Sequence, residues 1–283
     1  MSLLAVACFA IIVGGVMENK RKIIDVHTHI FPDKIAMRAV SNVGNYYGIN
    51  MGENGTALGL FESARDLEAR FVVSSAALKV ENVRHGNDFL LTCAAANKDK
   101  MVALGSVHQD MGFKSMISEL EYLKENGARG LKLHPDFQNF KIEDPKMFPI
   151  YEAAQSLKLP ILFHVGDENT VNSTPKALRF VADKFPDLDI IAAHMGGYMA
   201  WDEADEYLIG SRVYMDTSDA LLVLSKERVT EQINRHGADR IMFGSDFPLK
   251  GTYNAFVEFD SLAITEEQKE QIYHKTAEKL FNM

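Results

Sequence analysis

From residue 22 onward, short apolar runs alternate with amphipathic stretches of helical period, and this alternation most constrains the fold. Several of the runs are apolar without strict polar alternation, which is typical of strands that are buried on both faces. The predicted strands are 22–27, 71–76, 101–107, 130–134, 160–165, 189–194, 213–218 and 240–246.

Helix signals lie between the predicted strands. In the predicted helix over 174–187, Thr174 stands at the N-cap and Pro175 at the first helical position. Other predicted helices end at a glycine. The remaining clear helical patterns are 115–128, 225–239 and 265–281. Eight strand–helix units in about 260 residues predict an α/β fold of the (β/α)8 TIM barrel class. A doubly wound open sheet is the alternative, but no G-x-G-x-x-G follows a predicted strand.

Composition excludes some functions. The net charge of −9 argues against a nucleic-acid surface, because phosphate backbones are bound by basic faces. The two cysteines, Cys8 and Cys93, cannot build a disulfide framework, so a reducing, cytoplasmic location is expected. A small-molecule substrate is therefore the expected partner.

The N-terminus is expected to stand apart as an extension over 1–22, followed by a barrel over 23–283. Residues 3–16 are apolar or glycine throughout. This run is shorter than the about 20 residues of a membrane span, and its basic residues follow it rather than precede it. A start at Met17 is one interpretation; a native membrane anchor, an atypical signal and a packed extra element are the others.

Residues 30 to about 60 are rich in glycine and tyrosine and are predicted to be an irregular loop. A long loop at the catalytic end of a barrel is typical of a lid or substrate wall. Loop residues that could line the pocket are Phe31, Tyr46, Tyr47, Asn169, Asn172 and Trp201. Four other histidines, His85, His108, His236 and His274, are expected to be solvated or capping residues.

Polar side chains gather at the carboxyl ends of the predicted strands, which meet on one rim of a parallel barrel. They are His27, His29, Lys132, His134, His164, His194 and Asp246. Residues two apart on a strand share a face, so His27 and His29 are expected to point the same way. Burying several imidazoles together without a metal or counter-charge would cost free energy. The pattern therefore predicts a metal centre.

The predicted ligands are His27, His29, His164 and Asp246. A divalent ion held by three imidazoles and a carboxylate lowers the pKa of bound water toward ~7. His194 is left as an acid/base outside the ligand set, and Asp246 serves also as proton acceptor. These ligands suit Zn²⁺ best, with Mn²⁺, Fe²⁺ or Co²⁺ as alternatives.

The chain resembles the amidohydrolase superfamily of metal-dependent barrels over residues 22–283. The motifs that carry this resemblance are D-V-H-T-H (25–29), G-L-K-L-H-P (130–135), F-H-V-G (163–166), A-H-M-G-G (193–197) and F-G-S-D-F-P (243–248). The combination is most similar to the amidohydrolase-related branch that includes aminocarboxymuconate semialdehyde decarboxylase. The resemblance implies one metal on His27, His29, His164 and Asp246, a catalytic His194, and often a dimer.

Lys132 and His134 keep alternatives open. In binuclear relatives a lysine at this position is carboxylated and bridges two metals, so a second metal on Lys132, His164 and His194 is one hypothesis. Pairing of Lys132 with an acid such as Asp246 is favoured over it. His134 is expected to touch substrate or to hydrogen-bond its own loop.

Hydrolysis of a small amide, lactone or related compound by metal-activated water is the leading functional prediction. Non-oxidative decarboxylation of a small unsaturated or aromatic carboxylic acid is the alternative, and it would use nearly the same residues. A third hypothesis is a non-catalytic metal-binding barrel. A purely structural site would be closed by four protein ligands, and the spare acid/base groups here argue against it.

Overall fold

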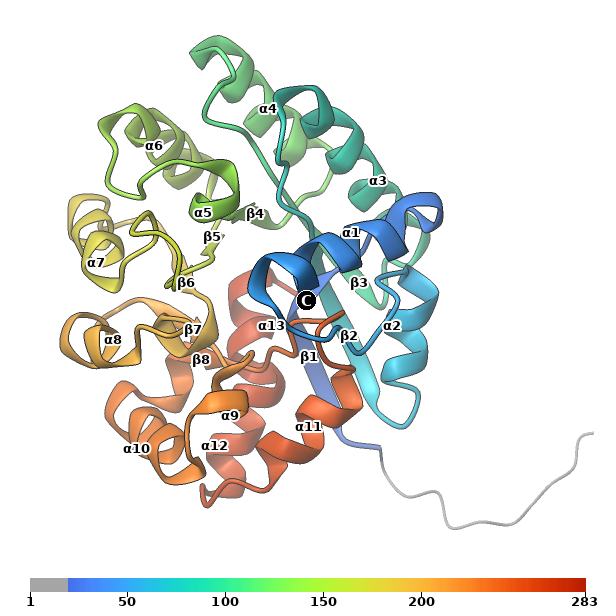
Figure 1. The fold of residues 1–283 in the computed structure, drawn as a ribbon, viewed down its shortest axis with the longest axis vertical. Helices are drawn as coiled ribbons and strands as arrows, with labels where there is room; N and C mark the ends of the chain where they lie inside the picture. The colour runs from blue at the N-terminus through green and yellow to red at the C-terminus, as the bar shows by residue number, and fades with distance from the viewer. Residues whose placement is uncertain (1–19) are drawn as a thin grey trace, which may run out of the picture.

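The computed structural model describes residues 20–283, and the predictions made for residues 3–16 lie outside this range. Eight parallel strands form one sheet in the order β1 to β8, with helices around the outside (Figure 1). β1 also pairs with the segment that follows β8, which closes the barrel. The Val26 and His29 amides donate to the carbonyls of Phe243 and Phe247 at 2.9 and 2.7 Å. The predicted TIM barrel is confirmed.

All eight predicted strands are present, although most are shorter than predicted. They are β1 (Lys22–His29), β2 (Glu68–Ser74), β3 (Met101–Gly105), β4 (Gly130–Leu133), β5 (Ile161–Phe163), β6 (Ile190–Ala192), β7 (Tyr214–Asp216) and β8 (Ile241–Met242). His134 and His164 therefore lie one residue beyond their strands, His194 lies two residues beyond β6, and Asp246 lies four residues beyond β8. Past the last ladder bond the backbone is free to turn, so these side chains can bend toward the barrel axis.

Helices follow the strands around the barrel. They are α1 (Asp33–Tyr47), α2 (Ala57–Ser63), α3 (Val83–Ala96), α4 (Phe113–Glu125), α5 (Pro135–Gln138), α6 (Phe148–Leu157), α7 (Pro175–Lys184), α8 (Trp201–Tyr207), α9 (Ala220–Val223), α10 (Lys226–His236), α11 (Thr252–Asp260), α12 (Glu266–Glu270) and α13 (Thr276–Phe281). The predicted cap at Thr174 is confirmed, since its side chain accepts from the Ala177 amide. No helix in residues 20–283 is long and apolar enough to cross a membrane.

Two apolar clusters stabilise the barrel. One fills its interior with side chains from six strands: Ile24, Val26, Val72, Leu104, Leu162, Ile191 and Met242. Phe281 of the last helix, α13, packs against this interior cluster, and Figure 1 places the C-terminus near the barrel axis. The second, larger cluster lies between the strands and the outer helices. The inside of the barrel is thus packed with side chains and is not a pore.

A bulge in β1 re-aims the two histidines of the H-x-H motif. Asp25 pairs with Phe71 and Thr28 with Val73, so three steps along β1 match two along β2. One extra residue on β1 reverses the alternation of its side chains after Val26. Val26 can therefore belong to the interior cluster while His27 and His29 both reach the pocket above it.

The prediction of an irregular loop over residues 30–60 is wrong. Residues Asp33–Tyr47 form the 15-residue helix α1, and Ala57–Ser63 form α2. In α1, Ala36, Val40 and Gly44 repeat every four residues and are buried, so the segment has the apolar stripe of a packed helix. The prediction rested on the tyrosines and glycines near the end of the segment, which are typical of loops, and not on that stripe. Figure 1 shows α1 lying across the strands near the centre of the view.

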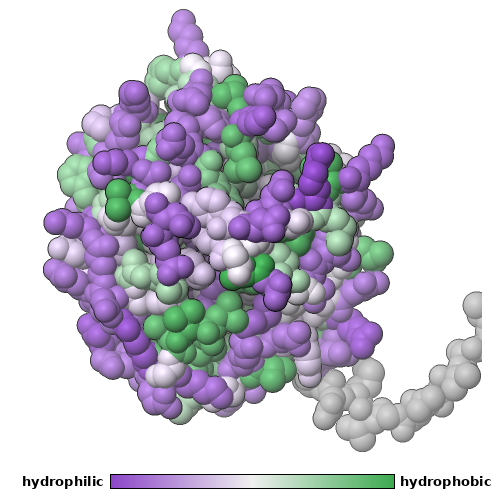
Figure 2. All heavy atoms as spheres, in the orientation of Figure 1, coloured by the Kyte–Doolittle hydropathy of each residue, from purple (hydrophilic) through white to green (hydrophobic). Residues whose placement is uncertain are grey.

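The surface in this view is mainly hydrophilic, with one larger apolar cluster (Figure 2). The cluster lies where Figure 1 shows α9, and Leu222 and Val223 of that helix are exposed.

His236 is buried rather than solvated, contrary to the prediction. Its Nε2 contacts the Val213 carbonyl at 2.8 Å, and its Nδ1 accepts from the Gly210 amide at 3.1 Å. Burial lowers the pKa of His236 to about 4 from 6.5. The unfolded chain therefore takes up a proton on His236 as pH falls below 6.5, whereas the folded chain resists uptake until about pH 4.

We expect this histidine to contribute about 3 kcal/mol of stability that is present above pH 6.5 and lost as pH falls to 4. Denaturant unfolding at several pH values, in the parent and in His236→Gln, tests this. The parent should lose more stability than the variant over that window, because all other groups titrate in both. Parallel pH profiles would contradict the prediction.

Candidate active site

Three predicted ligands meet at the floor of a pocket above the barrel. His27 Nε2 lies 3.3 Å and His29 Nε2 3.2 Å from the same oxygen, Asp246 Oδ1. The three ligand atoms lie within 4.8 Å of one another. For nitrogen and oxygen ligands about 2.0–2.2 Å from an ion, adjacent ligand atoms are roughly 3 to 3.5 Å apart. The spacing fits ligands that share one divalent ion.

Hydrogen-bond partners fix which nitrogen of each imidazole carries its hydrogen. His27 Nδ1 lies 2.9 Å from the Asp216 carboxylate, and His29 Nδ1 lies 3.3 Å from the Ser74 carbonyl. Both partners are acceptors, so Nδ1 is the donor in each neutral ring and Nε2 keeps its lone pair. Two lone pairs and the Asp246 carboxylate then face one another, and neither ring places a hydrogen between them. This arrangement calls for a cation, and the residues fit a metal ion.

Lys132 lies beside the ligands but does not pair with a carboxylate as predicted. Its Nζ is 3.0 Å from His27 Nε2, and no carboxylate oxygen of the described residues lies within 4 Å of it. The side chain is fully buried, and burial lowers the pKa of Lys132 to about 8, although Asp246 opposes this. Lys132 is a buried cation held next to the site by the barrel wall.

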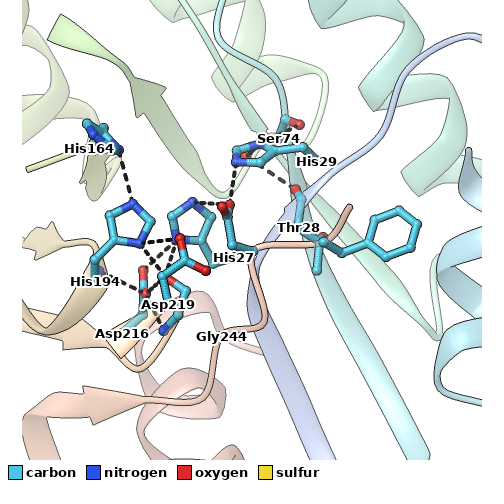
Figure 3. Close-up of polar contacts among 12 residues, drawn as sticks. His27, Thr28, His29, Ser74, His164, His194, Asp216, Asp219 and Gly244 are labelled. Atoms are coloured by element: carbon cyan, nitrogen blue, oxygen red, sulfur yellow. Dashed lines mark hydrogen bonds and ion pairs between the residues drawn. The ribbon is translucent and has the colours of Figure 1, made fainter. Parts of the chain in front are cut away.

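His164 and His194 form a pair next to the three ligands. His164 Nδ1 lies 3.0 Å from His194 Nε2, and Figure 3 shows the two rings joined in this way. Burial lowers the pKa of both rings, that of His194 to about 3, so both are neutral imidazoles. His164, predicted as a ligand, lies outside the group formed by His27, His29 and Asp246. Its predicted ligand role stays a prediction.

Asp219 and Asp246 face the same pocket with different charge states. The pKa of Asp219 is raised well above its usual value, first by burial and then by the neighbouring Asp246. Burial also acts on Asp246, but the imidazoles of His27 and His29 outweigh it and lower the pKa of Asp246. Two carboxyl groups in one buried site share their charge unequally, since both cannot ionise at low cost.

His134 belongs to the wall rather than to the ligand cluster. Its ring stacks on Phe137 and on His164, with centroids 3.9 and 4.0 Å away. Its Nδ1 accepts from the Phe137 amide, which confirms a hydrogen bond to its own loop. His134, Asp136 and His164 have ligand atoms close together, but Asp136 is already bonded to Thr170 and Ser173. Stacked imidazoles also direct their lone pairs in parallel, which suits a metal poorly.

A cavity of about 450 Å³ opens above these groups. All seven residues predicted at the strand ends line it, and among residues 20–283 Lys132 is the only lysine or arginine that does. Its upper wall comes from the α1 segment and includes Phe31, Val40, Val43, Ile49 and Met51. The predicted Tyr46 and Tyr47 also line it; Asn169, Asn172 and Trp201 do not. This volume and apolar lining are typical of a pocket for a small molecule.

The backbone at the rim is unusual at the residues that carry the chemistry. His194, Asp219 and Asp246 have φ values of 59°, 58° and 55°, in the left-handed region that most residues avoid. Such conformations persist where surrounding contacts enforce them, and they cluster at functional sites. Gly244, two residues after β8, leaves room for His27 and Asp216, because a Cβ there would lie 3.0 Å from the His27 Cβ and 3.3 Å from Asp216 Oδ1.

Asp216, Ser218 and Asp219 were missed by the sequence prediction. Asp216 accepts from His27 Nδ1, and Ser218 Oγ lies 2.8 Å from His194 Nδ1. Asp219 Oδ2 lies 3.3 Å from the same nitrogen. Figure 3 shows Asp216 and Asp219 below the His27 and His194 rings. The available signal was the M-D-T-S-D stretch at the end of the seventh predicted strand, on the same rim as the histidines.

Replacing Asp216 by asparagine should weaken metal binding by about 10- to 100-fold, because carboxylates that orient ligating histidines have effects of this size. His27 Nδ1–H would keep an acceptor but lose a charged one. Isothermal titration of the metal-free protein with Mn²⁺ or Zn²⁺ measures the change. Asp239→Asn, at an exposed aspartate three residues after α10, is the control. Equal affinities in parent and Asp216→Asn would contradict the role of Asp216.

The fold and the ligand cluster define a class, the metal-dependent barrels. The family model described as amidohydrolase matches residues 24–283, and the chain belongs to this family. The predicted resemblance, and with it an enzyme of this family, is confirmed.

Known relatives are distant but cover most of the chain. Gamma-resorcylate decarboxylase of Polaromonas sp. (strain JS666 / ATCC BAA-500) is 23% identical over 252 residues, covering 72% of this chain and 77% of the relative. The crystal structure of 5-carboxyvanillate decarboxylase from Sphingomonas paucimobilis superposes with a TM-score of 0.71 at 16% identity, covering 93% of this chain and 99% of that chain. The enzyme of the same name from Novosphingobium aromaticivorans DSM 12444, solved with manganese and 4-hydroxy-3-methoxy-5-nitrobenzoic acid, also gives 0.71 at 16%, covering 94% and 97%.

These comparisons correct the leading functional prediction. Hydrolysis was placed ahead of decarboxylation, whereas the named relatives are decarboxylases. The two reactions use nearly the same groups, so strand-end residues alone separate them poorly. The sequence alternative, decarboxylation, is better supported. Zinc as the specific metal has no such support, since the relative solved with a metal contains manganese.

Proposed function

We propose that the protein is a metal-dependent, non-oxidative decarboxylase of a small aromatic carboxylic acid. The observation that carries this proposal is the ligand cluster of His27, His29 and Asp246 at the floor of a ring-sized apolar cavity. The decarboxylases among the relatives support the reaction type. The open pocket above the cluster also argues against a closed, structural metal site.

His27, His29 and Asp246 would hold the ion. His164 would join them only if one of its ring nitrogens gave up its contact with His194 or Tyr47 and bound the metal instead. A divalent ion in this place would bind anionic oxygens of the acid and stabilise negative charge. Manganese and zinc both accept nitrogen and carboxylate ligands. We propose manganese ahead of zinc because a similar structure contains it.

Residues of the chain would divide the remaining work. Lys132 supplies positive charge for the carboxylate end of the substrate, and the α1 wall packs against its ring. When the bond between ring carbon and carboxyl carbon breaks, CO2 leaves and the electron pair stays on the ring carbon. That carbon then takes one proton, so each turnover consumes one. His194, Asp219 and Asp246 face the cavity and can carry it.

The direct test loads the protein with Mn²⁺ or Zn²⁺ and supplies a panel of hydroxylated benzoic acids that includes γ-resorcylate and 5-carboxyvanillate. We expect CO2 release and, in D2O, one deuterium at the ring position that the carboxyl group leaves. Asp246→Asn, which is expected to lose the metal, serves as the inactive control and is assayed with the same added metal. Absence of CO2 from every acid, with metal bound to the parent, would refute the proposal.

A further inference from the structure

The lysine and arginine charge that lines the cavity lies at its floor. Lys132 Nζ is 3.0 Å from His27 Nε2, so this charge belongs to the metal end, where the proposed function uses it for the carboxyl group that leaves. Among residues 20–283 no other lysine or arginine lines the cavity. Residues 1–19 contain neither lysine nor arginine, so they cannot add a guanidinium or a side-chain ammonium group.

Other cations lie near the cavity in sequence but do not line it. Helix α1 carries Lys34 and Arg38, which are exposed and absent from the cavity lining. Lys250 follows the lining residue Leu249, but its ammonium group pairs with Glu258 of α11. In the part of the chain that the structure describes, lysine and arginine charge in the cavity is thus confined to the floor.

Backbone hydrogen bonds hold the wall formed by α1 and the segment after it in this arrangement. The Gly52 amide donates to the Leu249 carbonyl at 3.0 Å, and the Glu53 amide donates to the Pro248 carbonyl at the same distance. A Cβ at Gly52 would lie 2.8 Å from the Leu249 carbonyl oxygen, so glycine permits this close approach. The wall is thereby tied to the loop that carries Asp246, at the floor of the cavity.

Carboxyl groups of the protein lie beside the cavity after β4 and β5. Asp136 lines the cavity, and Asp167 accepts from the hydroxyls of Tyr46 and Tyr47 at 3.5 and 3.3 Å. Each phenol has one hydrogen, and each hydrogen is directed to Asp167. A second carboxylate on the substrate would therefore face carboxyl groups here instead of a cation.

We propose that the substrate is an aromatic monocarboxylate, whose ring presents only uncharged substituents to the walls above the floor. This inference rests on the proposed function and narrows it. A second carboxylate in the cavity would lose hydration without gaining a cation, which costs free energy. Dicarboxylates such as 5-carboxyvanillate are therefore excluded as good substrates, although a similar structure is that of a decarboxylase named for this acid.

Three ring-matched nitro compounds test the inference through binding to the full-length chain loaded with Mn²⁺. The acid 4-hydroxy-3-methoxy-5-nitrobenzoate, which is present in one similar structure, has a nitro group in place of the leaving carboxyl group and keeps the second carboxylate. 2-Methoxy-6-nitrophenol lacks that carboxylate, and the methyl ester of the acid keeps its bulk without its charge. Isothermal titration should show that the phenol and the ester bind at least about 100-fold more tightly than the acid.

A cation added to the wall should reduce this discrimination. Asn42 of α1 is exposed and lines the cavity, so Asn42→Arg places a guanidinium group at the edge of the cavity. We expect this variant to bind the acid about tenfold more tightly than the parent and the ester equally well. Asn45→Arg, at an exposed residue of the same helix that does not line the cavity, is the control and should keep the parent affinities.

Turnover separates this inference from the proposed function. With the Mn²⁺-loaded parent, kcat/KM for the best monocarboxylate should exceed that for 5-carboxyvanillate by at least about 100-fold. Equal binding of the three compounds, binding of none, or equal effects of Asn42→Arg and Asn45→Arg would overturn the inference. Turnover of 5-carboxyvanillate that equals the best monocarboxylate would overturn it and leave decarboxylation standing. Discrimination against the acid without CO2 release from any substrate would refute only the proposed function.

Discussion

Replacing His27 by alanine should remove the bound metal and lower turnover by about 10³-fold or more, because the ion is expected to supply several kcal/mol of charge stabilisation. His27 joins two parts of the site: Nε2 faces Asp246, and Nδ1 donates to Asp216. Elemental analysis should give about one divalent ion per chain in the parent and almost none in the variant. Turnover of the best aromatic acid is measured on the same samples.

Two further variants make this result interpretable. Asp246→Asn keeps the shape of the ligand and should also lose metal, which separates loss of the site from a packing defect around His27. His85→Ala replaces an exposed histidine of α3 and should retain the parent metal content and turnover. A His27→Ala protein that keeps both metal and activity would contradict the assignment of this ligand cluster.

Replacing Lys132 by methionine should lower kcat/KM by about 10²-fold and stabilise the fold at the same time. A preorganised charged donor removed from a buried site typically costs 10²- to 10³-fold in rate. Lys132 is also a buried cation with no carboxylate of the described residues within 4 Å. A well-packed apolar side chain of similar volume should therefore raise the free energy of unfolding by about 1–3 kcal/mol.

Denaturant unfolding and steady-state kinetics on the same preparations test both halves of this prediction. Lys98→Met, at an exposed lysine, is the control and should change stability by less than about 0.5 kcal/mol. If Lys132→Met unfolds more easily than the parent and keeps its activity, Lys132 is a structural residue and its proposed role in substrate binding is wrong.

Much of the architecture could be predicted because local sequence reflects the environment of each strand. Strands buried on both faces need continuous apolar runs, and eight such runs separated by helical patterns are sufficient to indicate the barrel. The polar exceptions at the run ends, such as His27, Lys132 and His194, could be assigned to one rim. Parallel strands bring their carboxyl ends together, so position along the chain was enough to predict their convergence.

Other features depended on contacts that the chain order does not reveal. Asp216 and Asp219 were missed because their importance comes from His27 and His194, which lie far away in sequence. The segment of α1 was mistaken for a loop because its helix is stabilised by burial of Val40 and Gly44 against other elements. His164 was grouped with His27 and His29, yet in the structure it bonds to His194 and Tyr47.

The reaction, too, could be predicted only in part from the residues at the rim. Hydrolysis and decarboxylation both call for a divalent ion, a neighbouring acid/base group and a small pocket, so the residue types at the rim fit either. The choice between them came from similarity to decarboxylases over most of the chain. The lining of the cavity is consistent with that choice, because the α1 wall is apolar and Lys132 is the one lysine or arginine of the described part of the chain that lines it.

The sequence by itself determined the barrel, the rim on which the site lies and the residue types that can hold a metal. These follow from strand burial and from the parallel direction of the strands, which are local and repetitive properties. The tertiary structure decided the bulge that aims His27 and His29, the tautomers set by Asp216 and Ser74, and the placement of Tyr47 over His134 and His164. These depend on distances between segments remote in the chain, because a hydrogen bond forms only when folding brings donor and acceptor within reach.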